Sequence, residues 1–188
     1  MTRNGSTQLQ STEHGTSAFR VLRGIAVSSG YGSGSRPLHG ICLDVARQAG
    51  AAGNRPIGSI IVDAAGGIVA QGENRMYTTF DPTAHGETVA IREATRKLRT
   101  VDLSGCTLYT SLEPCPMCCW AIIDSRFGTL AMGGRYAGLG RKDMGRYSVE
   151  AFLEFMGRPL QLVTGIRARA CEDLRRAWEA EQQARARV

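Results

Sequence analysis

Two short segments, each at the start of an expected helix, constrain the fold of this chain most strongly. The first is His85-Gly86-Glu87, and the second, about thirty residues later, is Pro114-Cys115-Pro116-Met117-Cys118. Two cysteines three positions apart at a helix start lie on one turn, where the helix dipole favours the thiolate over the thiol. Because thiolates and imidazoles are metal ligands, the two helix starts are predicted to meet around one metal ion.

His85, Cys115 and Cys118 supply three ligands for Zn²⁺. Three protein ligands leave a tetrahedral ion one open position for water, as in catalytic zinc sites. Glu87 follows His85 too closely to be a comfortable fourth ligand, so we expect it to reach the water as a general base and acid. Glu113 is expected to be structural. Taken alone, the cysteine pair is compatible with a redox motif and the histidine with a core residue, whereas the joint spacing favours zinc.

The compartment of the protein decides how its six cysteines are interpreted. The best candidate for a signal-peptide core, Val21 to Val27, is short and interrupted by Arg23 and Gly24. No apolar run approaches the ~20 residues of a membrane span. We therefore expect a cytoplasmic protein with no membrane partner, in which cysteines serve a metal or catalysis before disulfides. The four remaining cysteines are expected to be buried apolar residues: Cys42, Cys106, Cys119 and Cys171.

Residues 1–35 are rich in Ser, Thr and Gly and show no period, so they are expected to form a flexible N-terminal tail before one domain at 36–188. Hydrophobic periodicity predicts helices at 38–49, 81–98, 115–125, 149–155 and 166–178, and strands at 57–63, 68–72, 106–111, 128–132 and 160–163. This order predicts the α/β class, as a three-layer α/β/α sandwich with a mixed sheet of about five strands. The inward face of the last helix is predicted to hold Ile166, Ala170, Leu174, Ala177 and Trp178.

The motifs resemble those of the cytidine deaminase-like superfamily, in the branch with guanine deaminases, fungal-type cytosine deaminases and tRNA adenosine deaminases. The similarity extends from about Pro56 to Trp178. It is carried by Pro56-Ile-Gly58, Glu73-Asn74-Arg75, Asp81-Pro-Thr-Ala-His-Gly-Glu87, Leu108-Tyr-Thr-Ser-Leu-Glu-Pro-Cys-Pro-Met-Cys118 and Ala121-Ile-Ile-Asp-Ser-Arg126. The resemblance implies a zinc-dependent hydrolase that converts an amino-substituted nucleobase or nucleoside-like heterocycle, such as guanine or cytosine, to the oxo product with release of ammonia. It also implies a homodimer, which the consecutive apolar residues Trp120 to Ile123 support.

Three residues are candidates for contact with this heterocycle. The resemblance gives Asn74 a hydrogen bond to the base, which its amide suits; an ordinary turn residue is the alternative. Ile57 is similar to a pocket wall residue, and it also fits an ordinary core position. Asp124, six residues after Cys118, occupies a position that related deaminases use at the pocket rim, although it also fits a solvated helix end.

Charge indicates what kind of substrate to expect. The chain carries a net charge of +6, yet residues 36–133 are neutral and the loop 134–147 has a net charge of +3. Within that loop Asp143 is a candidate to contact a base, and Arg141 and Lys142 to bind phosphate. Because no broad basic surface is indicated near the catalytic motifs, a small-molecule substrate is favoured over tRNA, without excluding nucleic acid. The open coordination position and Glu87 argue against a non-catalytic zinc module.

Overall fold

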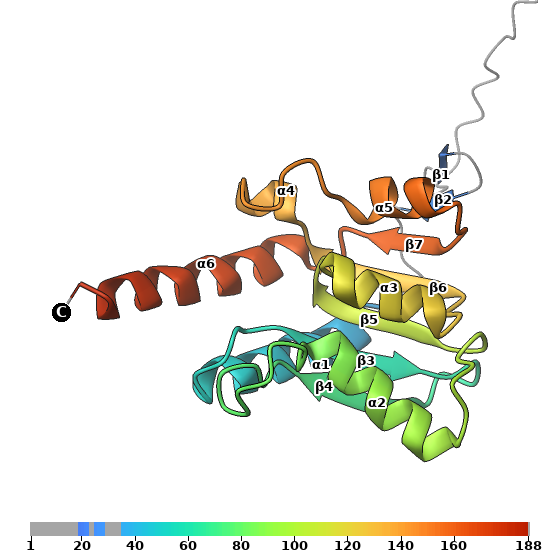
Figure 1. Cartoon of the computed structure of the whole chain (residues 1–188), viewed down its shortest axis with the longest axis horizontal. Coiled ribbons are helices and arrows are strands. Elements are labelled where there is room, and N and C mark those ends of the chain that lie inside the picture. Colours follow the sequence, from blue (N-terminus) through green and yellow to red (C-terminus); the bar gives the residue numbers. More distant parts are fainter. Residues whose placement is uncertain (1–18, 23–24, 29–34, 188) are drawn as a thin grey trace, which may run out of the picture.

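The computed structural model describes residues 19–22, 25–28 and 35–187 (Figure 1). The helices are α1 (Ser35–Ala51), α2 (Gly86–Leu98), α3 (Pro116–Asp124), α4 (Tyr136–Leu139), α5 (Val149–Met156) and α6 (Ala168–Arg185). The strands are β1 (Phe19–Leu22), β2 (Ile25–Ser28), β3 (Gly58–Val62), β4 (Ile68–Glu73), β5 (Thr107–Leu112), β6 (Thr129–Gly134) and β7 (Gln161–Thr164). All five predicted helices and all five predicted strands are present, and α4 is an additional short helix.

The strands form one mixed sheet in the order β1-β2-β7-β6-β5-β3-β4. Strands β2, β7, β6 and β5 are parallel to their neighbours in this series, whereas β3 is antiparallel to both β4 and β5. As a result, β4 and β5 run in the same direction on either side of β3. The loops that follow them therefore leave the same edge of the sheet, which is where the metal-ligand motifs lie.

The predicted mixed sheet of about five strands is confirmed in β3 to β7, and β1 and β2 extend this sheet beyond β7. These strands lie within the expected tail, so that prediction is wrong for residues 19–22 and 25–28; the rest of 1–34 lies outside the described residues. Runs of four residues are too short for periodicity to detect.

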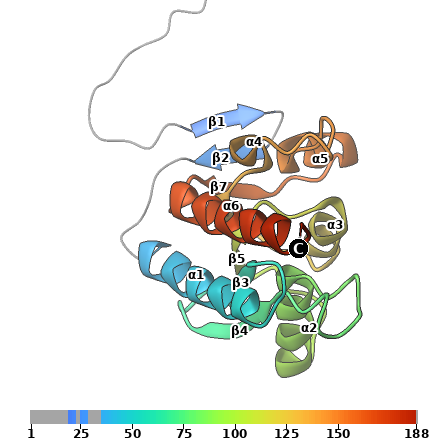
Figure 2. The same ribbon diagram turned by 90° about the vertical axis from the view of Figure 1, so that its left-hand side faces the viewer.

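Helices cover both faces of the sheet, so the predicted three-layer α/β/α architecture is confirmed. Figure 2 shows α1 and α6 on one face and α2, α3 and α5 on the other. Successive residues of β3 point to opposite faces of the sheet. Ile61 packs with Ala90 of α2 and Ile122 of α3 on one face, and Ile60 packs with Cys42 of α1 on the other. Within the described part of the chain, no helix is both long and apolar enough to cross a membrane.

Two predicted details are wrong. Helix α2 begins at Gly86 rather than at Asp81, because Asp81 accepts hydrogen bonds from the backbone N–H and the hydroxyl of Thr83 and so stabilises a turn before the helix. Of the residues expected to face inward, Ile166 is buried and Leu174 and Trp178 are partly buried, but Ala170 and Ala177 are exposed, and Cys171 and Arg175 are the buried residues of α6. The inward face is thus shifted by one residue, which corresponds to about 100° around the helix.

Candidate metal centre

The two ligand motifs occupy equivalent places at two helix starts. His85 is the N-cap of α2 and Cys115 is the N-cap of α3, each in an extended backbone conformation. Neither side chain caps its own helix, so both are free to face the space between the helices. Gly72 allows this approach, since a Cβ there would collide with backbone atoms of Gly86 and Ala90 in α2.

The three predicted ligands meet. The Nδ1 atom of His85 lies 3.5 Å from both the Cys115 and the Cys118 sulfur, and the two sulfurs are 3.6 Å apart. Tetrahedral Zn²⁺ with Zn–S of about 2.3 Å and Zn–N of about 2.0 Å requires N···S separations of about 3.5 Å and an S···S separation of about 3.8 Å. The separations between the ligand atoms therefore fit a zinc ion, in agreement with the predicted cofactor and with the two sulfur ligands and one nitrogen ligand.

Electrostatics also prepare the site for a cation. The hydrogen bond between the two sulfurs lowers the pKa of Cys115 to about 4 and raises the pKa of Cys118 well above its ordinary value. One thiolate is thus present at neutral pH before a metal arrives. Zinc binding displaces the proton of the other thiol, as it does whenever a cysteine becomes a ligand.

Glu87 lies in the first turn of α2, immediately beside the ligands. It is 2% exposed, and one carboxylate oxygen is 3.6 Å from the Cys118 sulfur. The other oxygen accepts a 3.5 Å hydrogen bond from the hydroxyl of Thr110. Burial raises the pKa of Glu87 to about 7. A carboxylate with such a pKa can both accept and return a proton at neutral pH.

The ligands and Glu87 open onto a small cavity of about 70 Å³. Its walls combine apolar, acidic and basic side chains from the segment before β3, the starts of α2 and α3, the end of β5, the 134–147 loop and α6. The lining residues are Arg55, Ile57, His85, Glu87, Leu112, Glu113, Cys115, Tyr136, Arg141, Met144 and Arg175.

The structure brings two of the four other candidates to this region. Ile57 lines the cavity, and buried Asn74 donates its backbone N–H to the carbonyl of Ile57. Asp143 is mostly exposed, and both of its carboxylate oxygens accept hydrogen bonds from Arg141, so Arg141 rather than Asp143 lines the cavity. That pairing lowers the pKa of Asp143 to about 2.

Asp124 does not border this cavity within one chain. Its side chain is exposed and lines a separate depression with Ile91 and Arg126. The six residues between Cys118 and Asp124 correspond to about 9 Å along a helix and a rotation of about 240° from the sulfur. Helix geometry thus turns Asp124 away from the metal ligands.

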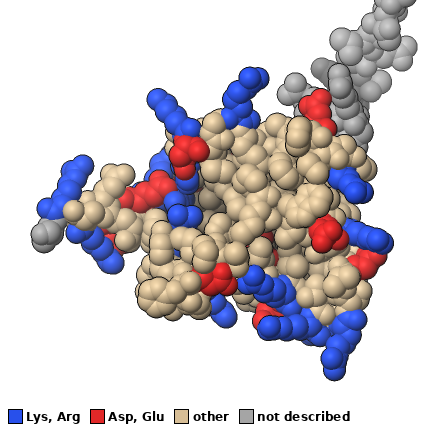
Figure 3. Space-filling view, in the orientation of Figure 1, with Lys and Arg blue, Asp and Glu red and all other residues tan. Residues whose placement is uncertain are grey.

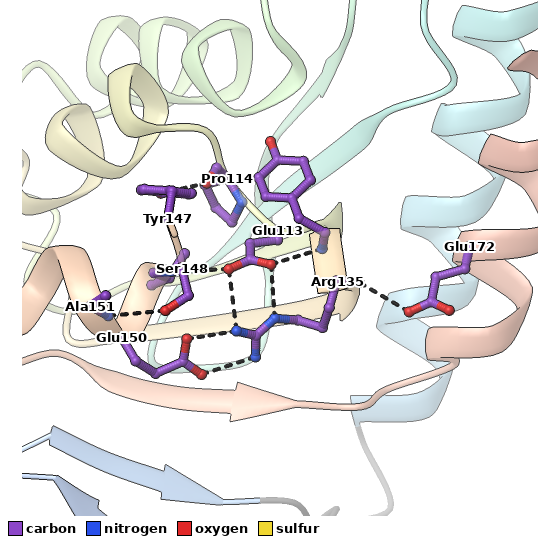
Figure 4. Close-up of polar contacts among 10 residues, drawn as sticks. Glu113, Pro114, Arg135, Tyr147, Ser148, Glu150, Ala151 and Glu172 are labelled. Carbon is purple, nitrogen blue, oxygen red and sulfur yellow. Dashed lines mark hydrogen bonds and ion pairs between the residues drawn. The ribbon is translucent and has the colours of Figure 1, made fainter. Parts of the chain in front are cut away.

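A buried ionic network fixes the loop that follows β6 (Figure 4). Glu113 is 2% exposed and accepts hydrogen bonds from two guanidinium nitrogens of Arg135 and from the backbone N–H groups of Tyr136 and Val149. Arg135 also donates twice to Glu150. Because Glu113 precedes Pro114 and Cys115, this network joins the α3 start to the loop, in agreement with the structural role expected of Glu113.

Sequence reasoning missed several wall residues. Tyr136 and Met144 lie in the 134–147 loop, which was expected to contribute to the site without assigned roles for them. Arg55 precedes β3, and Arg175 lies on the buried side of α6. No local pattern marks either arginine, because both reach the cavity through tertiary packing. The remaining cysteines, Cys42, Cys106, Cys119 and Cys171, are buried as expected.

Residues 35–133 match the family defined as the cytidine and deoxycytidylate deaminase zinc-binding region. A tRNA-specific adenosine deaminase from Aquifex aeolicus is 45% identical over 86 residues, which cover 46% of this chain and 56% of that protein. A guanine deaminase from Bacillus subtilis is 51% identical over 71 residues, which cover 38% and 45%. The chain thus spans about half the length of these relatives.

A solved structure extends the similarity to most of the chain. The guanine deaminase from Nitrosomonas europaea is 29% identical, with a TM-score of 0.68 over 87% of this chain and 88% of that one. The relatives therefore include enzymes named for a free base and enzymes named for tRNA.

Proposed function

We propose that this chain, which belongs to the cytidine and deoxycytidylate deaminase zinc-binding family, hydrolyses the amino group of a nucleobase or nucleoside-like heterocycle. The observation that carries the proposal is the position of Glu87. A buried carboxylate with a pKa near neutrality lies beside three zinc ligands and faces a cavity. A purely structural zinc site has no use for an ionisable group in this place.

The residues suit a hydrolytic deamination. When bound, zinc lowers the pKa of a water ligand to about 7 and so supplies the nucleophile. Glu87 takes a proton from the attacking water and delivers it to the ring nitrogen next to the amino-bearing carbon. A second proton passes through Glu87 to the amine, the C–N bond breaks, and ammonia and the oxo product leave. One carboxylate serves as base and then as acid.

Asn74 is our candidate for holding the ring. It is fully buried, and its Oδ1 atom accepts a hydrogen bond from the backbone N–H of Met76. Its Nδ2 atom has no hydrogen-bond partner in the described parts of the chain. A buried unpaired donor costs about 1–3 kcal/mol. A carbonyl oxygen or ring nitrogen of the substrate would satisfy it.

The surface supports a small-molecule substrate. On the face drawn in Figure 3, basic side chains are dispersed and interleaved with acidic ones, and the area over α3 is largely uncharged. A tRNA substrate would favour a continuous basic surface around the cavity. The alternative, adenosine-to-inosine conversion in tRNA, is favoured by the similarity to the Aquifex aeolicus enzyme. Both substrates use the same zinc chemistry.

We also propose that the chain forms a homodimer through α3. Trp120 is 43% exposed on this helix, and Ala121 and Ile123 are only partly buried. All three belong to α3, and the area over α3 in Figure 3 is largely uncharged. A second copy would remove their apolar surface from water.

The function is tested by ammonia release from zinc-loaded protein with free bases, nucleosides, 5′-monophosphates and an anticodon stem-loop. The paired variants are Glu87→Gln and Glu93→Gln, since both residues lie on α2 and only Glu93 is exposed. Glu87→Gln is expected to retain zinc and fold but to lose at least about 10²-fold in kcat. Glu93→Gln should match the wild type. Full activity in Glu87→Gln with an intact metal site would refute the assignment.

A further inference from the structure

Three arginines from distant parts of the chain line the cavity that contains the metal ligands. Arg55 precedes β3, Arg141 follows α4, and Arg175 lies on α6. Arg55 stands 5.8 Å from the ring centroid of Tyr77 and forms no ion pair with any carboxylate in the described ranges. Its charge is therefore available to a ligand.

Arg175 is the most unusual of the three, because it is an arginine that is only 5% exposed. The guanidinium lies 4.9 Å from the ring centroid of Trp178, and its Nε and Nη2 atoms are both 2.8 Å from Glu179. The third nitrogen, Nη1, is buried without a hydrogen-bond partner among the described residues. Packing thus holds Arg175 in place, while one of its donors remains unused.

Two acidic residues, Glu87 and Glu113, also line the cavity, but Glu87 lies beside the metal ligands and Glu113 is hydrogen-bonded to Arg135. The three arginines therefore have no carboxylate partner of their own on the cavity side. Asp143 and Glu179 pair with Arg141 and Arg175, but neither carboxylate lines the cavity. Burial lowers the pKa of Arg175, and the charges of Arg55 and Arg141 act in the same direction, while Glu179 opposes them. A neutral heterocycle would leave this repulsion in place, whereas an anionic group would relieve it.

We infer that the substrate of the proposed deaminase carries a phosphate monoester, bound by Arg55, Arg141 and Arg175 while its heterocycle lies at the zinc ligands. Arginine suits phosphate because its planar donors match two phosphate oxygens at once. A terminal phosphate can be enclosed by a cavity wall. An RNA phosphodiester must leave the pocket in both directions, which a buried Arg175 on the wall does not favour. The class is therefore a nucleoside monophosphate or a similar phosphorylated heterocycle.

The test compares matched substrates that differ only in phosphate. Zinc-loaded wild type, Arg55→Gln and Arg126→Gln are assayed for ammonia release on each free base, its nucleoside and its 5′-monophosphate, and on an RNA stem-loop. Arg126 is the control, since it is exposed at the end of α3 and pairs with Asp102 away from the cavity. Equilibrium binding of the same nucleosides and monophosphates is measured by calorimetry.

For the base that is turned over, kcat/KM should be about 10- to 100-fold higher for the monophosphate than for the nucleoside, the range of one charge-assisted hydrogen bond. Arg55→Gln should remove most of that ratio, in binding as well as in turnover, and Arg126→Gln should preserve it. Equal kcat/KM for nucleoside and monophosphate, an Arg55→Gln effect that is the same for all substrates, or faster turnover of the stem-loop would overturn the inference. Ammonia release from none of the compounds would instead refute the proposed deaminase, and the calorimetric ratio would still decide the phosphate site.

Discussion

Replacing Glu113 with glutamine tests whether the buried ionic network sustains both the fold and the cavity wall. The Glu113 carboxylate accepts hydrogen bonds on both oxygens: Arg135 Nε and the N–H of Tyr136 reach one oxygen, and Arg135 Nη2 and the N–H of Val149 reach the other. Glutamine keeps only one acceptor oxygen. Either orientation of its amide therefore places an NH₂ group against two donors.

The size of the effect follows from these contacts. Glu113→Gln removes a charge that is 2% exposed and loses two hydrogen bonds, while Arg135 retains its two bonds to Glu150. Removal of one partner from a buried ion pair typically costs 3–5 kcal/mol, and the remaining Glu150 places our expectation near 3 kcal/mol. For a domain of 150–250 residues this corresponds to a fall in Tm of about 6–12 °C.

Thermal unfolding monitored by circular dichroism measures the loss. Glu93→Gln is the matched control, since Glu93 is exposed and pairs only with Arg96 one turn away; its Tm should change by less than about 2 °C. Zinc content in Glu113→Gln should remain at one per chain, whereas kcat/KM should fall, because Tyr136 and the rest of the 134–147 loop lose their attachment. A Tm within 2 °C of the wild type would refute our account of the network.

Other perturbations address the metal, the proposed dimer and the sheet. Cys115→Ala should lose zinc by metal analysis and unfold more readily, because metal binding is coupled to folding; full zinc occupancy would contradict the ligand assignment. Trp120→Glu should raise the dimer dissociation constant by at least about tenfold in sedimentation equilibrium. Phe155→Glu changes another exposed apolar residue and should leave this constant unchanged. A wild type that is monomeric at micromolar concentration would exclude this interface. Deletion of residues 1–30 removes β2, which pairs with β7, and should cost about 2 kcal/mol in hydrogen bonds between these strands, which lowers the Tm by about 4–8 °C. Deletion of residues 1–18 should leave the Tm unchanged. Equal Tm values for the two deletions would show that the hairpin does not stabilise the sheet.

Local patterns predicted those features that depend on neighbours in the sequence. The central strands β3, β5 and β6 alternate or are largely apolar, because both faces of the sheet are covered there. The zinc ligands depend on a spacing of three residues in one helix and on a second helix start, so they too were visible. The inward side of α6 was not, since Arg175 occupies a buried position that hydrophobic periodicity assigns to an apolar residue.

The zinc ligands and Glu87 could be predicted from the sequence, whereas the arginine cluster of the cavity could not, and two of these arginines lie outside the segment that matches the family. The family match ends at residue 133 and includes His85, Glu87 and both cysteine ligands. Arg141 and Arg175 lie beyond it, in the loop after β6 and in α6, although both line the same cavity. The shared segment can therefore retain one hydrolytic reaction while the later segment changes the charge and shape of the wall. By this reasoning, relatives with the same zinc motif can act on a free base or on RNA, and we expect residues after 133 to select the substrate together with Arg55 and Asn74 in the shared segment.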